Sequence, residues 1–511
     1  MKDISEIDIK SIKKSIIIFH LTDTYFIKES KIGKEIDLPG FGRIYRILEL
    51  LSKNQKGNKI LFLHSGDFLF PSFLSNYFKG KQMVDILNRC GLNYCTLGNH
   101  DFDEGLQILK KRIKESKFKY IVTNLSPANQ ISENILHYDI WPDNSSIIAT
   151  LGVAGKMTAK KALENRFKIK NLKNILKETL LEIRKKFPMI KLLIVLSHMS
   201  DFEDLELKKL LNRLWPFNSI ILGGHDHKQV ISYNCKLDKC LLLKGKSNAR
   251  TTQMVILNEE LINQDNQNLK KNMMILDSED YQKITPSRKI EDQIELWYKK
   301  LKKENHLPST KIVKKFPKGE VLDGTEESLR KGTTNLGNFV TDCLKNYTDT
   351  DIALINSGHF RCDRRFLEKL NVFDLFNTFV MEQRGGILVT KLSKKECVLF
   401  LKHGYSQEGK GKILQFSKDT LNILKNAKNE TEFNVALISD MLFTDEDGFG
   451  KILASSRKTS LVNLRKRLKR DIVKDANLIK GMLKCASKVK YDSKIRLQMR
   501  NKTRLDSISK I

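Results

Sequence analysis

In the first half of the chain, five short apolar runs each end in a cluster of polar residues. Runs such as 16–19 and 192–196 have the length of buried β-strands, and helix-like segments such as 172–187 separate them. Strands that alternate with helices predict an α/β layered fold. In α/β sheets, ligand sites gather beyond the carboxyl ends of the strands. We therefore expect the polar clusters to meet at one edge of the sheets.

The stretch 98–103 carries the most chemistry of these clusters. It reads Gly-Asn-His-Asp-Phe-Asp and follows the strand-like run 93–97. Asn99 offers a neutral oxygen ligand and His100 an imidazole, and Asp101 and Asp103 are two carboxylates able to orient that imidazole. Taken alone, the stretch is equally compatible with a simple turn. The other clusters make a turn a poor explanation, because they add Asp23, Asp67, His198, His225 and His227.

Asp, Asn and His side chains in this combination suit a pair of metal ions. Hydrolysis of a phosphate monoester needs the phosphoryl charge neutralised, a water activated and the leaving oxygen stabilised. Two metal ions about 3.5–4 Å apart do all three. Such a pair needs one shared carboxylate plus imidazole and oxygen ligands. The candidate ligands are Asp23, Asp67, Asn99, His198, His225 and His227, which leaves His100 to face the substrate.

The order of the motifs carries a resemblance to a known family. The first half of the chain contains Asp23-Thr24-Tyr25, Gly66-Asp67, Gly98-Asn99-His100-Asp101, Ser197-His198 and Gly224-His225-Asp226-His227. The second half contains Asn335-Leu336-Gly337-Asn338, Asn356-Ser357-Gly358-His359-Phe360-Arg361 and Asp447-Gly448-Phe449. Each motif is weak alone, but the ordered set, over residues 14–455, resembles calcineurin-like metallophosphoesterases of the 5'-nucleotidase family.

This resemblance implies the fold class and the cofactors. The expected fold is a four-layer αββα metallophosphatase domain followed by a smaller α/β 5'-nucleotidase C-terminal domain. The expected cofactors are two divalent metal ions, whose identity among Zn, Mn, Mg, Co and Fe the ligand types do not distinguish. Asp67 would bridge both ions. The other ligands implied by the resemblance are Asp23 and His227 for one ion, and Asn99, His198 and His225 for the other.

The resemblance also implies catalytic and substrate-binding residues. His100, oriented by Asp103, would stabilise the transition state and protonate the leaving group. Arg361 would hold the phosphate, because a planar guanidinium is a bidentate donor. Phe449 is equally compatible with core packing. The full set of expected substrate-binding residues is Arg361, Asn356, Asp447, Phe449 and Phe443.

The chain departs from the secreted members of the family in two places. Those members have Asp-x-His in the first motif, whereas this chain has Tyr25, which either ligates a hard metal as phenolate or leaves one site a ligand short. An intracellular branch, which includes mannosylglucosyl-phosphoglycerate phosphatases, also has Asp-x-Tyr. Secreted nucleotidases clamp the base between two aromatic rings. Ile413 and Met441 stand in the corresponding stretches here, unless Phe443 takes one place.

We therefore expect a phosphoric ester hydrolase that removes phosphate from a nucleoside monophosphate or a similar small phosphate ester. A sugar-phosphate phosphatase of the mannosylglucosyl-phosphoglycerate type and a cyclic phosphodiesterase are the alternatives within this chemistry. A basic binding protein with an inactive site is the alternative outside it.

Composition divides the chain into expected domains. A polar, Asn-rich stretch separates a metallophosphoesterase domain (14–258) from a C-terminal domain (310–456), and residues 259–309 form a linker with a bridging helix. Residues 457–511 hold 18 Lys or Arg against 4 Asp and form an expected basic helical tail. Leu461, Leu464, Leu468 and Ile472 mark one face of it. A helix lying on the second domain is favoured over binding of nucleic acid or an anionic membrane.

The net charge, the cysteines and the apolar runs bear on the cellular location of the protein. The net charge of +31 comes mainly from Lys spread along the chain, a pattern typical of a Lys-biased proteome. The eight cysteines show no metal-binding spacing and favour a reduced, intracellular protein. No run approaches the roughly 20 apolar residues of a membrane span. We therefore expect a cytoplasmic protein without a membrane span.

Overall fold

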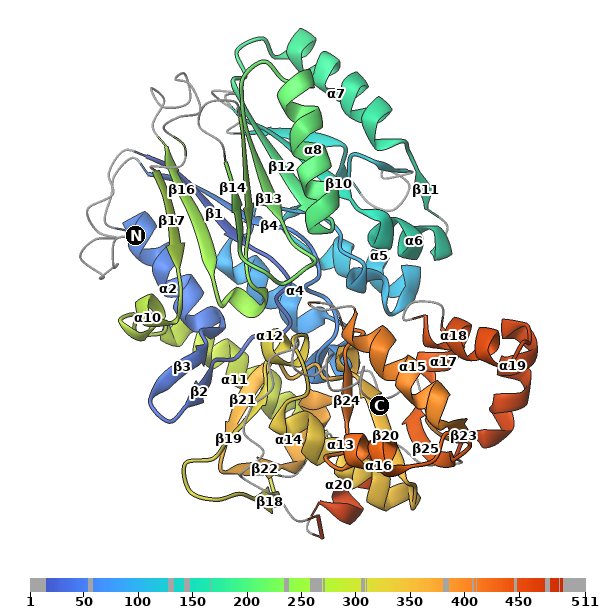
Figure 1. Ribbon diagram of the computed structural model, residues 1–511. Coiled ribbons are helices and arrows are strands. Elements are labelled where there is room, and N and C mark those ends of the chain that lie inside the picture. Colours follow the sequence, from blue (N-terminus) through green and yellow to red (C-terminus); the bar gives the residue numbers. More distant parts are fainter. Residues whose placement is uncertain are drawn as a thin grey trace. The chain divides into compact units, whose positions relative to one another are not determined.

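The computed structural model separates the chain into two compact units, Met1–Lys303 and Glu304–Ile511 (Figure 1). Each unit has its own sheets and its own hydrophobic core. The residues that the structure describes are 15–53, 58–126, 133–141, 148–165, 167–233, 239–257, 269, 272–304, 308, 310–379, 386–406, 409, 411–444, 448–473, 478–486 and 488–489.

The first unit contains two large sheets. The strands of the first sheet are, in spatial order, β17 (Met273–Leu276), β16 (Thr252–Leu257), β1 (Ile16–Leu21), β4 (Lys59–His64), β5 (Tyr94–Cys95), β6 (Lys119–Ile121) and β8 (Ile135–Leu136). The strands of the second are β14 (Val230–Ser232), β15 (Cys240–Lys244), β13 (Asn218–Gly223), β12 (Leu192–His198), β10 (Ile148–Ala154) and β9 (Tyr138–Trp141).

The central strands of both sheets are parallel. In the first sheet β1, β4, β5, β6 and β8 run in the same direction, and in the second sheet β10, β12, β13 and β15 do so. All residues of β1, β12 and β13 are buried, as expected for strands covered on both faces. The carboxyl ends of parallel neighbours lie at the same edge of a sheet, so the loops after them are brought together.

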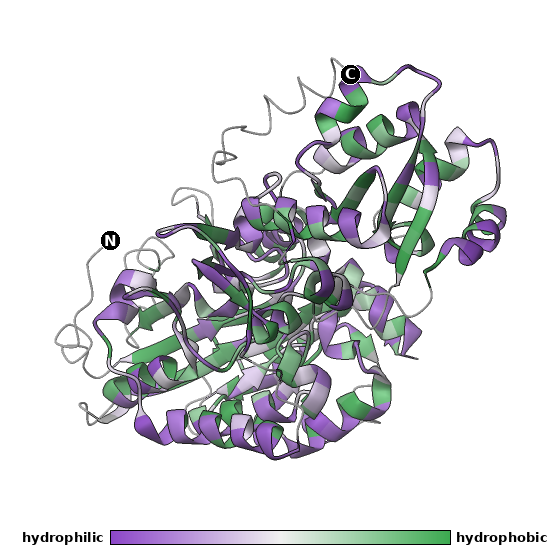
Figure 2. Cartoon of the chain, turned by 90° about the horizontal axis from the view of Figure 1, so that it is seen from below, coloured by the Kyte–Doolittle hydropathy of each residue, from purple (hydrophilic) through white to green (hydrophobic). Residues whose placement is uncertain are grey.

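The two sheets pack face to face and helices cover their outer faces. Ile18 and Leu61 of the first sheet share a buried cluster with Ile194 and Ile220 of the second. The outer face of the first sheet packs against α2 (Gly40–Lys53), α4 (Lys81–Cys90), α5 (Gly105–Glu115) and α11 (Arg288–Lys303), and that of the second against α7 (Leu172–Lys186) and α8 (Asp201–Leu214). This confirms the expected four-layer αββα arrangement, and Figure 2 shows the apolar strands between mixed helices.

The helix expected to bridge the domains belongs to the first unit. Ile290, Ile294 and Trp297 on α11 are buried in the same cluster as residues of α2 and α4. Three apolar residues at helical spacing give α11 one apolar face, and that face packs into the core of the first unit. The sequence pattern located the helix, but a helical period does not say which core a helix joins.

The second unit is built on a smaller mixed sheet. Its strands, in spatial order, are β23 (Ile387–Ser393), β25 (Glu432–Ile438), β20 (Ile352–Asn356) and β24 (Leu414–Phe416). Alternate residues of β20 face opposite sides. Ala353 and Ile355 pack with α13 (Asn335–Thr348), whereas Ile352 and Leu354 pack with α15 (Lys394–Tyr405).

The described part of the expected basic tail is packed into the second unit. Leu464 and Leu468 of α19 (Leu461–Leu468) are buried, and Leu461 and Ile472 pack against the same cluster. Met482 of α20 (Leu478–Cys485) is buried beside residues of α13. The segment is therefore two short helices rather than one, and its apolar residues complete the core.

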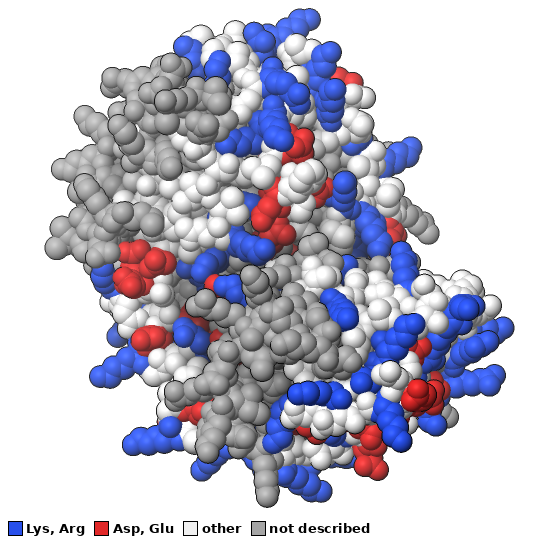
Figure 3. All heavy atoms as spheres, in the orientation of Figure 1, with Lys and Arg blue, Asp and Glu red and all other residues white. Residues whose placement is uncertain are grey.

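The structure also shows how basic side chains are distributed on one face and whether any described helix could cross a membrane. Lys and Arg side chains are spread over much of the face seen in Figure 3. None of the described helices combines the length and the apolar character that crossing a membrane requires.

Candidate active site

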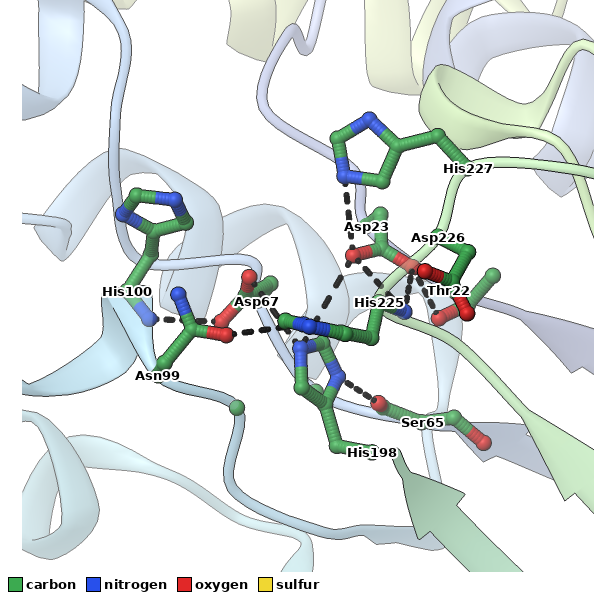
Figure 4. A network of polar contacts seen from close by, with 12 residues as sticks. Thr22, Asp23, Ser65, Asp67, Asn99, His100, His198, His225, Asp226 and His227 are labelled. Atoms are coloured by element: carbon green, nitrogen blue, oxygen red, sulfur yellow. Dashed lines mark hydrogen bonds and ion pairs between the residues drawn. The ribbon is translucent and has the colours of Figure 1, made fainter. Parts of the chain in front are cut away.

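The six expected metal ligands come together in the first unit (Figure 4). Each lies at or just after the carboxyl end of a strand, so the loops of both sheets converge on one point. The strands concerned are neighbours: β1, β4 and β5 in the first sheet, and β12 and β13 in the second. The residues are Asp23, Asp67 and Asn99 from the first sheet, and His198, His225 and His227 from the second.

One group of polar atoms surrounds Asp23. Nε2 of His227 lies 3.2 Å from Oδ1 of Asp23. The Tyr25 hydroxyl lies 3.0 Å from the same Nε2 and 3.5 Å from the same Oδ1. The other oxygen, Oδ2, accepts hydrogen bonds from the Thr22 hydroxyl (2.6 Å) and the His225 amide (3.0 Å). Tyr25 therefore contacts both expected ligands of one ion.

A second group joins His198, Asp67, Asn99 and His225. Nε2 of His198 lies 3.2 Å from Oδ2 of Asp67 and 4.0 Å from Oδ1 of Asp23. Nδ1 of His225 lies 3.0 Å from Oδ1 of Asn99. The imidazoles of His198 and His225 pack edge to face, with ring centroids 5.2 Å apart. His198 therefore lies near both carboxylates, Asp67 of this group and Asp23 of the first.

The donor set at the centre fits a metal ion. One ligand atom each from Asp23, Asp67 and His198 can be chosen so that all three lie within 4.8 Å of one another. Nε2 of His198 is buried and has no hydrogen-bond partner among the described residues, while its Nδ1 is held 2.7 Å from the Ser65 carbonyl. A histidine held by one nitrogen, with the other aimed at carboxylates, is the usual arrangement of a metal-ligating imidazole.

The electrostatics of the cluster call for positive charge. Asp23 and Asp67 are 0% and 1% exposed, and buried carboxylates are costly unless they are paired. Burial alone would raise the pKa of Asp23, but His227 and His198 hold it well below its usual range. Burial alone would lower the pKa of His198, yet the Asp67 carboxylate raises it to about 9. These residues would hold a metal ion, which would add the positive charge that the buried carboxylates favour.

Backbone strain is concentrated at the same residues. Asp23, Asp67, His225 and His227 have φ angles of 51°, 56°, 80° and 58°, in a region that residues other than glycine rarely adopt. Such conformations cost about 1–3 kcal/mol each and persist only where the surroundings enforce them. The fold holds four of the six candidate ligands in strained conformations, which is typical of a functional site.

His100 and Asp103 form a pair next to the ligand cluster. Nδ1 of His100 lies 2.8 Å from Oδ2 of the buried Asp103, and the His100 side chain is 16% exposed. The His100 amide donates to Oδ1 of Asp67 at 2.7 Å. The carboxylate fixes the ring, and the backbone ties the pair to the cluster, so His100 is positioned to act on a group bound there.

Asp101 has a different role from the one that the sequence suggested. Its carboxylate does not orient His100 but accepts four backbone N–H groups, at 2.8–3.1 Å, from Asp67, Phe68, Leu69 and Gly98. Burial, together with the nearby Asp67 charge, raises the pKa of Asp101 to about 6. Asp101 therefore fixes the two loops that carry Asp67 and Asn99.

Sequence reasoning assigned no role to two buried histidines beneath the loops. His64 accepts the Gly66 amide at Nδ1 (3.1 Å), and its Nε2 lies 2.9 Å from the Thr24 hydroxyl. Nε2 of His20 lies 2.8 Å from the Ser65 hydroxyl. Burial lowers the pKa of His64 to about 3 and of His20 to about 4, so both are neutral. A histidine at the end of a fully apolar strand was the available signal.

The expected substrate-binding residues lie in the second unit. Asn356 ends β20, is buried and hydrogen-bonds through Oδ1 to Nδ1 of His359. The Arg361 side chain is 16% exposed and lies 3.9 Å from the Glu326 carboxylate. Within the part of the chain that the structure describes, its Nε has no hydrogen-bond partner. Asp447 is outside the described residues.

Burial bears on the expected aromatic contacts and favours core packing for Phe449. Phe449 is 0% exposed and packs against Phe400 and His403 in the core of the second unit, so its ring presents no face to a ligand. Ile413 and Met441 are also 0% exposed. Both belong to one hydrophobic cluster of the second unit: Ile413 directly precedes β24, and Met441 lies on α17 (Asp440–Phe443). Phe443 is partly buried against the same cluster.

Comparison with family models decides the assignment. Residues 16–229 match the calcineurin-like phosphoesterase model, and residues 313–440 match the model of the 5'-nucleotidase C-terminal domain. The chain belongs to the 5'-nucleotidase family. Divalent metal ions are implied by the phosphoesterase half of this family, and the cluster of Asp23, Asp67 and His198 offers a candidate site for them.

Individual relatives of the 5'-nucleotidase family are distant. A snake venom 5'-nucleotidase from Gloydius brevicauda is 28% identical over 194 residues, which cover 36% of this chain and 31% of the venom protein. The chain thus spans about a third of the length of the curated relatives it matches.

Solved structures of other proteins share the fold. A 5'-nucleotidase precursor from Thermus thermophilus superposes with a TM-score of 0.68 at 15% identity, covering 92% of this chain and 96% of that one. The sulfate thiohydrolase SoxB from the same species has a TM-score of 0.60 at 11% identity, covering 89% and 94%. Two different enzyme names on one fold show that the fold does not decide the substrate.

The space beside Gly98 leads to a testable prediction about metal binding by the cluster. A Cβ at this position would lie 2.1 Å from Oδ1 and 2.7 Å from the backbone nitrogen of Asp67. Gly98→Ala therefore displaces the Asp67 carboxylate, and we expect metal affinity to fall by about tenfold or more. Calorimetric titration with Mn²⁺ measures this.

Gly386→Ala is the matched control, because its Cβ would meet only the Cγ2 atom of Ile472, at 3.2 Å. Unchanged metal affinity in Gly98→Ala, in protein that is folded, would contradict the position given to Asp67.

Proposed function

We propose that the protein is a metal-dependent phosphomonoesterase that releases phosphate from a nucleoside monophosphate or a similar small phosphate ester. The observation that carries this proposal is the convergence of six metal-ligand side chains beside the His100–Asp103 pair. Family membership supports the reaction class. The substrate is inferred from the relatives' names, so it needs its own test.

The proposed ligand sets follow the two groups of polar atoms. Asp23 and His227 belong to one ion, Asp67 is shared, and the ligands of the other ion are Asn99, His198 and His225. When bound, two divalent ions neutralise phosphate charge, activate water and stabilise the leaving oxygen. The protein holds these six groups in place. The strained loops and the hydrogen bonds to Asp101 fix their positions in the structure.

His100 supplies the proton chemistry in this proposal. Because Asp103 accepts a hydrogen bond from Nδ1, the other ring nitrogen is the one available to the substrate. An imidazolium at His100 would give its Nε2 proton to the oxygen of the leaving alcohol and become a neutral imidazole. The Asp103 carboxylate would stabilise the imidazolium before that transfer, as in other carboxylate–histidine pairs.

The first prediction of this proposal concerns His100→Ala. Loss of a general acid usually lowers turnover by about 10²–10⁴-fold. We expect that loss in kcat with metal content unchanged, because the His100 side chain is not among the proposed ligands. Release of inorganic phosphate from an aryl phosphate and metal analysis of the same sample measure both.

Asp67→Ala is the control for this test, and it should lose both metal and activity. A His100→Ala protein that loses metal in parallel with activity would show that His100 has been given the wrong role. Wild-type protein that binds metal and hydrolyses no phosphate ester above the Asp67→Ala level would overturn the proposed function.

Tyr25 is proposed as a further ligand of the ion held by Asp23 and His227. The three atoms lie 3.0, 3.5 and 3.2 Å apart. A phenolic oxygen this close to a carboxylate and an imidazole would be able to share an ion with them.

Tyr25→Phe tests this assignment because it removes the hydroxyl and keeps the ring. We expect one of two Mn²⁺ binding events to weaken by about tenfold or more while the other is unchanged. Tyr138→Phe, which removes a hydroxyl bonded to Glu182 at the surface, is the matched control. Two unaltered binding events in Tyr25→Phe would exclude Tyr25 as a ligand.

A second candidate function is a sugar-phosphate phosphatase. The observation that favours it concerns Ile413 and Met441, which are not aromatic and are fully buried. Neither position therefore offers a ring to clamp a base. Both candidate substrates contain a phosphate group. We therefore predict under either function that Arg361 binds the phosphate.

A panel of phosphate esters separates the two candidates. The nucleotidase proposal expects kcat/KM for AMP or UMP to exceed that for sugar phosphates by at least about tenfold, which corresponds to a base contact of about 1.4 kcal/mol. A kcat/KM that is higher for sugar phosphates than for AMP and UMP would replace the nucleotidase proposal by the sugar-phosphate function.

A further inference from the structure

Lys244, at the end of β15, is a charged side chain in the interior of the first unit. The side chain is 1% exposed, and an ammonium group at such a place is costly unless it is fully paired. Its Nζ donates to the Met199 carbonyl at 2.9 Å. It also lies 2.8, 3.0 and 3.1 Å from the carboxylates of Asp201, Asp204 and Asp226. One buried cation thus joins four points of the chain.

Those four points belong to the segments that carry the candidate imidazole ligands. Met199 directly follows His198, and Asp226 stands between His225 and His227. Asp201 and Asp204 lie in the first turn of α8, which begins at the end of β12. Lys244 therefore contacts residues adjacent in sequence to three of the six candidate ligands.

The contact with Asp226 acts on the most strained of these segments. His225 and His227 both have positive φ angles, so the loop needs an external restraint to keep this conformation. Oδ2 of Asp226 accepts from Lys244 Nζ and, at 2.6 Å, from the amide of Asp201. These two contacts fix the one side chain that lies between the two histidines.

The sequence makes room for this arrangement. A Cβ at Gly223, just before the loop, would lie 2.9 Å from Cγ of Lys244 and 3.0 Å from Oδ2 of Asp204. A larger residue at this position would therefore push the lysine stem or its partner aside. The glycine allows the lysine to pass close to β13 and reach the loop.

We propose that Lys244 is a positioning residue that holds His225 and His227 in their metal-binding orientation through Asp226. This inference rests on the proposed metal site and deepens it. Lys244 acts through Asp226 and not on the ions, so its removal changes the affinity for metal more than it changes the rest of the fold.

Metal affinity and fold stability, measured on the same variant, test the proposal. Lys244→Met removes the charge and keeps most of the stem. We expect Mn²⁺ alone, titrated by calorimetry without substrate, to bind about 10–100-fold more weakly, the usual loss for a partner that orients ligands. Lys208→Met is the matched control, because Lys208 is a buried lysine on α8 that bonds to Ser232 instead.

Asp226→Asn keeps the test decisive if Lys244→Met does not fold. The Asp226 side chain is 27% exposed, so the change is tolerated by the packing, and it removes the charge that Lys244 contacts. We expect a comparable loss of Mn²⁺ affinity. In the double variant the two losses should not add, because both remove the same link.

The outcomes separate this inference from the proposed function. Mn²⁺ affinity within about threefold of wild type in folded Asp226→Asn or Lys244→Met would overturn the inference, whatever the melting temperature, because an orienting partner is worth more than that. Wild-type protein that binds no Mn²⁺ would overturn it as well. Wild-type protein that binds Mn²⁺ but hydrolyses no phosphate ester would remove the proposed function and leave the positioning role to be decided by the titration.

Discussion

The burial of two carboxylates at the junction of the sheets is the constraint on which the site depends. Asp23 and Asp67 are shielded from water, and buried carboxylates need positive partners. The nearest partners are imidazoles from the opposite sheet, at 3.2 Å in both cases. Imidazoles held by hydrogen bonds on one nitrogen are also metal ligands, so the groups that balance the charge in this structure are the groups that would hold ions.

The architecture explains how these groups are kept together. Parallel strands bring their carboxyl ends to one edge, and packing of the two sheets brings the two edges into register. The loops then adopt strained backbone conformations, which glycines at positions 98 and 224 permit by leaving space for Asp67 and Asp23. Buried polar residues beneath them, with Asp101 accepting four amides, hold the loops rigidly.

The sequence predicted the parts of the site that follow from strand ends, and missed those that follow from three-dimensional register. Asp23, Asp67 and His198 were found because each ends an apolar run. Asp101 and Asp103 were indistinguishable, since only the short helix at 100–102 decides which carboxylate faces His100. Lys244 gave no signal, because its partners lie 18 to 45 residues earlier in the chain. Burial of Phe449 was undecided, because an aromatic residue suits a core and a ligand site equally.

The central claim is that this cluster binds two metal ions on either side of Asp67. The most direct measurement is anomalous X-ray diffraction from crystals grown with Mn²⁺. We expect two anomalous peaks about 3.5–4 Å apart, one beside Asp23 and His227 and one beside Asn99, His198 and His225, with the Asp67 carboxylate between them. No peak at the cluster, or ions that do not touch Asp67, would contradict it.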